Sequence, residues 1–132
     1  MILIDTNVYS ASNIGNADAI AVMKQSSVIC LPTVVIAELR AGFLNGNKNE
    51  INNKVLNDFL SDEKCQIVDI TIDTTRTYAQ LAYFAKARGR SLSNNDIWIA
   101  AIAKEKDLKL VTFDKDFEVF SNIFNNQLLI LN

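Results

Sequence analysis

Four short acidic motifs lie far apart in the 132-residue sequence, and each of them adjoins an apolar run. Their acids are Asp5, Glu38, Asp96 and Asp114, with Asp116 as an additional acid shortly after the last. Unpaired carboxylates that share a site must either take up protons or bind cations. Oxygen ligands without histidine or cysteine favour Mg²⁺ or Mn²⁺. If these acids meet in space, they indicate a divalent-cation site that hydrolyses phosphodiesters with a metal-activated water.

The chain contains no histidine, and this narrows the chemistry further. Histidine general bases, Ser-His-Asp triads and zinc sites with histidine ligands are all excluded. The formal net charge of −2, from 13 basic and 15 acidic residues, disfavours a polyanionic partner. However, bound cations neutralise acidic ligands, and many of the basic residues concentrate between Lys86 and Lys115. The charge therefore does not exclude a nucleic-acid substrate.

Short apolar runs alternate with helical patterns along the whole chain. The apolar runs predict strands over residues 1–4, 28–31, 65–70, 108–113 and 128–131. Helices are expected over 17–24, 34–41, 55–60, 74–88 and 97–106, with a short helix or turn through 117–120. Polar connections are expected over 10–16 and 45–53, and Gly42 and Gly89 are expected to end helices. This alternation predicts one α/β domain over residues 1–132, a three-layer sandwich with a mostly parallel sheet of about five strands and helices on both faces.

The predicted sheet would bring the acids together at one edge. Parallel strands end at the same edge, and Asp5 and Asp114 directly follow the first and fourth strands. Glu38 lies early in the helix after the second strand, and Asp96 begins the helix that descends toward the fourth. Thr6 and Asn7 follow Asp5, and their short polar groups are expected to orient carboxylates or a metal-bound water.

Each of these residues also has a purely structural explanation. Thr6, Asn7 and the two strand-end aspartates are common turn formers. Glu38 could be an ordinary helix-surface acid. Ser93 and Asp96 match a capping box, in which an acid follows a capping serine by three residues. The common placement on one edge favours a functional site over these separate explanations.

The four motifs together resemble those of PIN-domain proteins, and within that family the VapC toxins of bacterial and archaeal toxin–antitoxin pairs. The resemblance spans nearly the full chain and is carried in order by IDTNV, AELRAG, NDIWIAA and VTFDKDF. It implies a PIN fold and an endoribonuclease that depends on Mg²⁺ or Mn²⁺. It also implies a catalytic quartet and a metal-ligand set: Asp5, Glu38, Asp96 and Asp114 for catalysis, and Asp5, Asp96, Asp114 and Asp116 for the metal.

The resemblance implies partners as well. Members of the family usually cleave structured RNA such as transfer or ribosomal RNA, and they commonly form homodimers. A VapB-like antitoxin typically wraps the toxin and inserts a segment, often a basic side chain, into the acidic site. Arg40 and Arg90 match positions where the family often has arginine, and we consider both as contacts for RNA phosphates. A cytoplasmic location is expected, because neither a signal-peptide pattern nor an apolar run of roughly 18 residues is present.

Other functions remain open at this point. The same fold could serve RNA processing without toxicity, or act as a partner-binding module. A haloacid-dehalogenase phosphotransferase also has an aspartate after the first strand, but it needs a second acid where this chain has Asn7. A receiver domain needs a lysine after the fifth strand, and no lysine follows Leu128. Both of these alternatives leave Glu38 and Asp96 unexplained.

Overall fold

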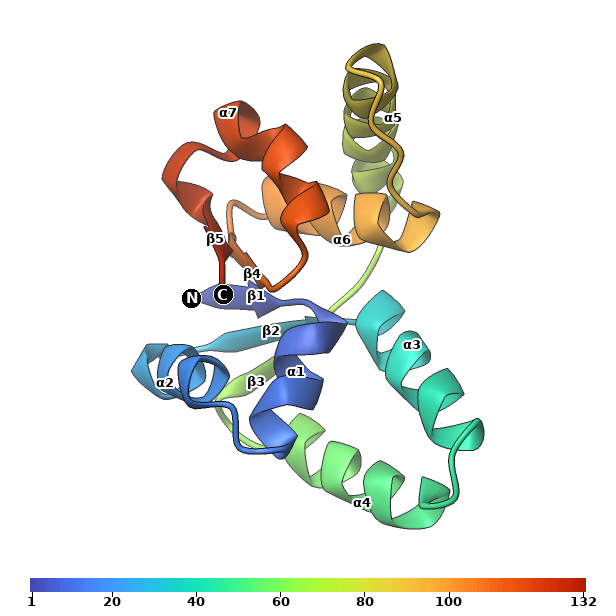
Figure 1. Ribbon diagram of the computed structural model, residues 1–132, viewed down its shortest axis with the longest axis vertical. Coiled ribbons are helices and arrows are strands. Elements are labelled where there is room, and N and C mark those ends of the chain that lie inside the picture. Colours follow the sequence, from blue (N-terminus) through green and yellow to red (C-terminus); the bar gives the residue numbers. More distant parts are fainter.

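The computed structural model describes residues 1–132 and contains a sheet of five parallel strands in the order β3-β2-β1-β4-β5 (Figure 1). The strands are β1 (Ile2–Ile4), β2 (Ile29–Pro32), β3 (Cys65–Val68), β4 (Lys109–Thr112) and β5 (Leu128–Ile130). In the centre of the sheet Leu3 pairs with Cys30 on one side and with Leu110 on the other. The predicted α/β fold with a parallel sheet of five strands is confirmed.

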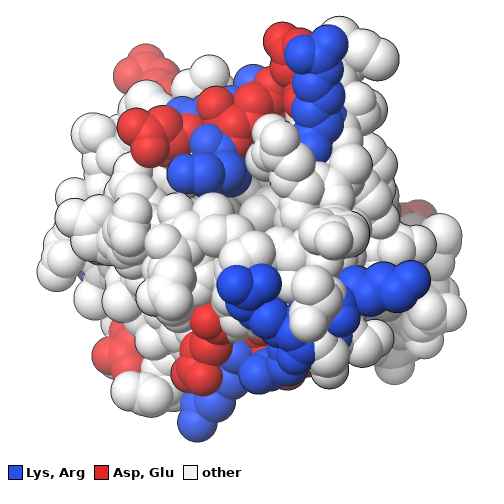
Figure 2. Space-filling model, turned by 90° about the horizontal axis from the view of Figure 1, so that it is seen from above, with Lys and Arg blue, Asp and Glu red and all other residues white.

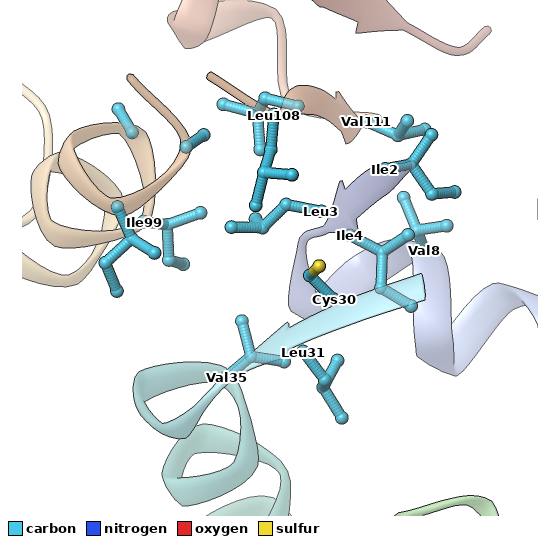
Figure 3. Packing of buried hydrophobic residues seen from close by; sticks show 14 of the residues in the cluster. Ile2, Leu3, Ile4, Val8, Cys30, Leu31, Val35, Ile99, Leu108 and Val111 are labelled. Atoms are coloured by element: carbon cyan, nitrogen blue, oxygen red, sulfur yellow. The ribbon is translucent and has the colours of Figure 1, made fainter. Parts of the chain in front are cut away.

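Helices connect the strands on both faces of the sheet. They are α1 (Thr6–Asn13), α2 (Ala17–Gln25), α3 (Thr33–Leu44), α4 (Asn49–Leu60), α5 (Ile72–Ala87), α6 (Asn94–Glu105) and α7 (Ser121–Phe124), with 3-10 turns η1 (Lys115–Phe120) and η2 (Asn125–Gln127). The chain moves outward from β1 to β3 and then returns through β4 to β5. Because such crossovers are right-handed, the direction change sends the later helices to the opposite face. Figure 3 shows this for α1, which carries Val8, and α6, which carries Ile99.

The core lies between the sheet and these two helical layers. Leu3 and Ile4 have no exposed surface, and in Figure 3 Leu3 points toward α6 while Ile4 points toward α1. Alternate residues of a strand face opposite sides, so β1 feeds both halves of the core. Burial of each such side chain contributes about 1.5–3 kcal/mol. Residues 99–103 of α6 are fully buried, so packing fixes where the first turn of α6 lies.

Helix α1 occupies part of the region expected to be a polar connection. Its inner face buries Val8 and Tyr9, while Ser10 and Asn13 lie on the outer face. The apolar residues of α1 are only Val8, Tyr9 and the small Ala11, which give a weak helical pattern. The prediction of a polar connection over residues 10–16 was therefore wrong for residues 10–13. Gly15, with φ of +88°, ends the α1 region as expected of a breaker.

The hairpin of α3 and α4 also differs from the prediction. Gly42 does not end α3, which continues to Leu44. Helix α4 begins at Asn49, within the predicted connection, and the Asn53 side chain donates to the Asn49 carbonyl at 3.0 Å. Asparagine favours turns because its side chain competes for backbone hydrogen bonds, but here those bonds lie inside a packed helix. The strands β3, β4 and β5 are one or two residues shorter than expected at their ends.

None of the helices combines the length and apolar character that crossing a membrane requires.

Candidate functional site

Asp5 stands at the end of β1 and caps the start of α1. Only 4% of its surface is exposed. Its Oδ1 accepts a hydrogen bond from the Thr6 N–H at 2.7 Å, and its Oδ2 accepts one from Thr112 Oγ1 at 2.7 Å. Both carboxylate oxygens are therefore oriented, one by α1 and the other by the neighbouring strand β4.

Thr112 is a site residue that the sequence analysis missed. It has no exposed surface, and its Oγ1 also accepts the Asp114 N–H at 2.9 Å. One hydroxyl therefore connects two of the predicted acids. Threonine is common in β-strands, so at the end of a strand it is most simply explained by its preference for the sheet. The available signal was its position two residues before Asp114, on the edge where Asp5 was also predicted.

Asn7 holds the loop after β4 against the start of α1. Its Oδ1 accepts the Phe113 N–H at 3.2 Å, and its Nδ2 lies 3.5 Å from Thr112 Oγ1. The side chain therefore positions the backbone that leads to Asp114.

Glu38 reaches the same edge from α3. It lies in the second turn of that helix and is half-buried. Thr6 Oγ1 donates to Glu38 Oε1 at 2.7 Å, while the Thr6 N–H holds Asp5. Thr6 thus links two acids that are 33 positions apart in sequence. A shallow depression of about 310 Å³ between α3 and Asn95 adjoins Glu38 and leaves this side of the site open.

Asp96 combines a capping position with a place among the other acids. Ser93 Oγ accepts the Asp96 N–H at 3.1 Å, so the predicted serine cap of α6 is present. The pKa of Asp96 is raised to about 6: burial is the largest cause, and the negative charges of the neighbouring acids add to it, while the hydrogen bond from Ser93 opposes the rise. Asp96 therefore follows the predicted serine cap and also lies within the field of the other acids.

The pKa of Asp5 is raised too. Burial is the largest cause, and the charges of Glu38 and Asp114 add to it, while the hydrogen bonds from Thr112 and Thr6 oppose the rise. The four acids consequently act on one another through space. The structure brings Asp5, Glu38, Asp96 and Asp114 to one edge of the sheet, where their charges are in excess.

Asp116 and the two arginines are arranged differently. The Asp116 N–H donates to Asp114 Oδ1 at 2.9 Å, but its exposed carboxylate faces Arg90, with Oδ1 4.0 Å from Nη2. Arg40 turns to α4, where it donates to Asn53 Oδ1 at 2.6 Å and to Asn57 Oδ1 at 3.1 Å. Residues two apart on a helix point about 200° from each other, so Arg40 faces away from Glu38. Arg90 lies beside the acids, and Arg40 does not.

The donor set fits Mg²⁺ or Mn²⁺ in kind, because it consists of carboxylate and hydroxyl oxygens with neither histidine nor cysteine. The negative charges that add to the effect of burial on the pKa values of Asp5 and Asp96 fit a cation as well. However, no three acidic side chains lie close enough together to hold an ion. Asp5 and Glu38 instead accept hydrogen bonds from threonines, and Asp116 is directed to Arg90.

Comparison with known proteins agrees with this geometry. The PIN domain model matches residues 2–122. Ribonuclease VapC5 of Mycobacterium tuberculosis is 30% identical over 115 residues, covering 87% of this chain and 84% of that protein. Toxin FitB of Neisseria gonorrhoeae is 32% identical over 122 residues, covering 86% of this chain and 88% of that protein. The structure of VapBC2 from Rickettsia felis, bound to a promoter DNA fragment, superposes with a TM-score of 0.78 at 27% identity, covering 100% of this chain and 98% of that one. The chain therefore belongs to the PIN-domain family.

Proposed function

We propose that this protein is a metal-dependent endoribonuclease and the toxin of a VapBC-type toxin–antitoxin pair. The observation that carries the proposal is the group of acids Asp5, Glu38, Asp96 and Asp114 at one edge of the sheet, two of them with raised pKa values. The names of the relatives support it, since two of them are ribonucleases VapC5 and VapC2 and another is a toxin.

The metal belongs to the proposal. Asp5, Asp96, Asp114 and Asp116 would hold Mg²⁺ or Mn²⁺, with Glu38 completing the catalytic acids. Such an ion, when bound, lowers the pKa of a water molecule and offsets the charge of a phosphodiester. The acids themselves repel the phosphate of the bond that is cut, so a cation is needed before that phosphate can approach them.

The uncharged polar residues have positioning roles in this proposal. Thr112 and the Thr6 N–H orient the two oxygens of Asp5, and the Thr6 hydroxyl orients Glu38. Asn7 holds the backbone between Thr112 and Asp114. These contacts hold carboxylates from three elements in a defined arrangement at one edge of the sheet.

The partners follow from the same likeness. The similar solved structures include VapBC2 from Rickettsia felis and a toxin–antitoxin complex from Klebsiella pneumoniae. We extend this to a VapB-like antitoxin for the present chain, with a basic side chain that neutralises the acidic edge. A homodimer and a cytoplasmic location, where translated RNA is found, complete the proposal.

The decisive test compares the wild type with Asp5→Asn. Purified wild type should cleave RNA when Mg²⁺ or Mn²⁺ is added and stop when a chelator is added, whereas Asp5→Asn should be inactive while its circular dichroism stays unchanged. Asp18→Asn, an exposed acid in the first turn of α2, is the matched control and should remain active. Full activity of Asp5→Asn would overturn the site assignment.

Expression in growing cells separates toxin from processing enzyme. Growth arrest by the wild type, absent with Asp5→Asn, supports the toxin. Cleavage in the test tube without growth arrest would favour a PIN-domain RNA-processing nuclease. No cleavage at all would favour a partner-binding PIN module.

A further inference from the structure

The segment from Lys86 to Ser91 carries positive charge that the fold does not compensate. It contains Lys86, Arg88 and Arg90 and no acid. Only Arg90 has an acidic partner, Asp116, at the 4.0 Å limit of an ion pair. The Arg88 guanidinium lies 3.4 Å from the centre of the Phe84 ring and also bonds to the Phe84 carbonyl, so its orientation is set by an aromatic face and a backbone oxygen. This concentration of free cations stands out in a chain with net charge −2.

Two contacts place this segment beside the acidic edge. Arg90 meets Asp116, whose backbone is bonded to Asp114. One turn earlier, Phe84 of α5 packs near Phe120 of η1, with ring centroids 6.3 Å apart. The turn η1 starts directly after Asp114. The basic segment and the acidic site are therefore joined through one short element.

A cleft of about 350 Å³ opens under the segment. Its floor is apolar, with Leu92 and Ile97, and its rim carries Lys86, Arg90 and the hydroxyl-bearing Ser91. Gly89, with φ of +68°, reverses the chain so that these side chains border one opening. From above, on the side toward which α5 extends in Figure 1, Lys and Arg side chains lie in two groups, each with acidic side chains beside it, and uncharged surface lies between the groups (Figure 2).

We infer that the segment Lys86–Ser91 and its cleft bind the RNA backbone one or more nucleotides away from the bond that is cut. The inference rests on the proposed function, and it names the surface that makes an acidic protein bind a polyanion. Arginine and lysine bind phosphate oxygens strongly, and the acids nearby repel the same phosphates unless a cation intervenes. Phosphates on one side of the cut are thereby held at the segment, while the acidic edge faces the phosphate of the bond that is cut. Arg40 is left out, because its guanidinium is committed to α4.

Salt-dependent RNA binding tests this inference. A short fluorescein-labelled single-stranded RNA is titrated with wild type and with a Lys86→Gln, Arg88→Gln, Arg90→Gln triple variant in EDTA, which prevents cleavage. The triple variant should bind at least tenfold more weakly, and its slope of log affinity against log salt should be shallower by about two, since each phosphate contact on a single strand contributes about 0.7. Lys24→Gln is the matched control, because Lys24 and Lys86 both lie in the last turn of a helix.

The outcomes separate this inference from the proposed function. If wild type cleaves RNA and the triple variant binds with unchanged affinity and slope, the basic segment is not the anchor, although the nuclease assignment stands. Equal weakening by Lys24→Gln would overturn the inference as well, because only net charge would then matter. If the wild type neither binds nor cleaves RNA, the proposed function itself fails. If the triple variant unfolds, Lys86→Gln alone, which changes one exposed side chain, serves as the second variant. A smaller loss of RNA affinity and a smaller change in the salt slope are then expected.

Discussion

Two glutamates of this protein make nearly the same contact in different surroundings. Glu38 accepts a hydrogen bond from Thr6 Oγ1 at 2.7 Å, and Glu105 accepts from Thr74 Oγ1 at 2.5 Å and from Thr71 Oγ1 at 3.1 Å. In both cases a threonine at the start of one helix is bonded to a half-buried glutamate on another. Glu38 contributes to the raised pKa values of Asp5 and Asp96, whereas Glu105 contributes to neither.

The difference teaches that the threonine–glutamate contact does not itself mark a functional acid. Glu105 fastens the start of α5 to the last turn of α6, and its two threonines satisfy both carboxylate oxygens. Glu38 has only one such bond, and other carboxylates lie around it. An acid that is saturated with donors serves the fold, while one that is left among like charges is available to a cation.

The largest expected difference between Glu38 and Glu105 is the effect of removing their charge on RNA cleavage. Glu38→Gln keeps an oxygen for Thr6 but loses the negative charge, and RNA cleavage is expected to fall by about 10²–10³-fold, the usual effect of removing one electrostatic group from an active site. Glu105→Gln should cleave at the wild-type rate. Initial rates on one labelled RNA, at fixed Mg²⁺, measure both. Equal activity of the two variants would break the comparison.

Truncation to alanine should have the opposite ranking in stability: Glu105→Ala should destabilise the protein more than Glu38→Ala. Glu105→Ala removes the carboxylate that accepts from the Thr74 hydroxyl, which has no exposed surface, and leaves that hydroxyl bonded only to Thr71. The loss of a hydrogen bond to a charged group costs about 1.5–3 kcal/mol, which corresponds to a fall in Tm of several degrees for a domain of this size. Glu38→Ala should cost less, because Thr6 is only half-buried. Thermal melting followed by circular dichroism decides this, and a larger loss for Glu38→Ala would contradict it.

Much of the site's arrangement could be read from sequence because it depends on local rules. A strand followed by a polar residue places Asp5 at the sheet edge, and Ser93 three residues before Asp96 places that acid in the first turn of α6. The alternation of strands and helices then brings these positions to the same edge. The same reasoning put Asp114 after β4, where the structure has it.

Contacts between distant segments could not be read in this way. Thr112 and Asp5 are 107 residues apart, and nothing in either motif names the other as its partner. The pairing of Asp116 with Arg90 and the turn of Arg40 toward α4 likewise depend on how helices pack. Helix α1 was missed over residues 10–13 because its polar outer face outweighs two buried side chains. The periodicity of apolar residues indicates which face of a helix or strand is buried, but it does not indicate which side chains of other segments contact that face.

The pH dependence of stability should reveal the charge repulsion at Asp96, which lies among other carboxylates. The pKa of Asp96 is raised to about 6, so the folded protein binds this proton more tightly than the unfolded chain does. The charged form therefore lowers stability above pH 6, and the penalty fades as the pH falls from 6 toward 4. Asp96→Asn should stabilise the metal-free protein by roughly 1 kcal/mol at pH 7–8, after allowance for solvent screening of a half-buried group. Denaturant unfolding in EDTA at pH 4, 6 and 8 should show the gain shrinking with acidity. A gain that is the same at every pH would show that crowding of charge is not its cause.

The Tyr9 hydroxyl extends the comparison to a buried group that has no hydrogen-bond partner. Tyr9 of α1 is 2% exposed, its ring packs edge-on against Phe59 at a centroid distance of 5.4 Å, and its hydroxyl bonds to no protein atom. Removal of an unpaired buried hydroxyl loses no hydrogen bond and relieves its desolvation, so Tyr9→Phe should leave the free energy of unfolding unchanged or raise it by up to about 1 kcal/mol. Thr74→Val, which removes a hydroxyl bonded to Glu105, should lower it. Urea unfolding of the two variants side by side makes the measurement. If Tyr9→Phe destabilises as much as Thr74→Val, the bond to the carboxylate is not what makes the Thr74 hydroxyl stabilising.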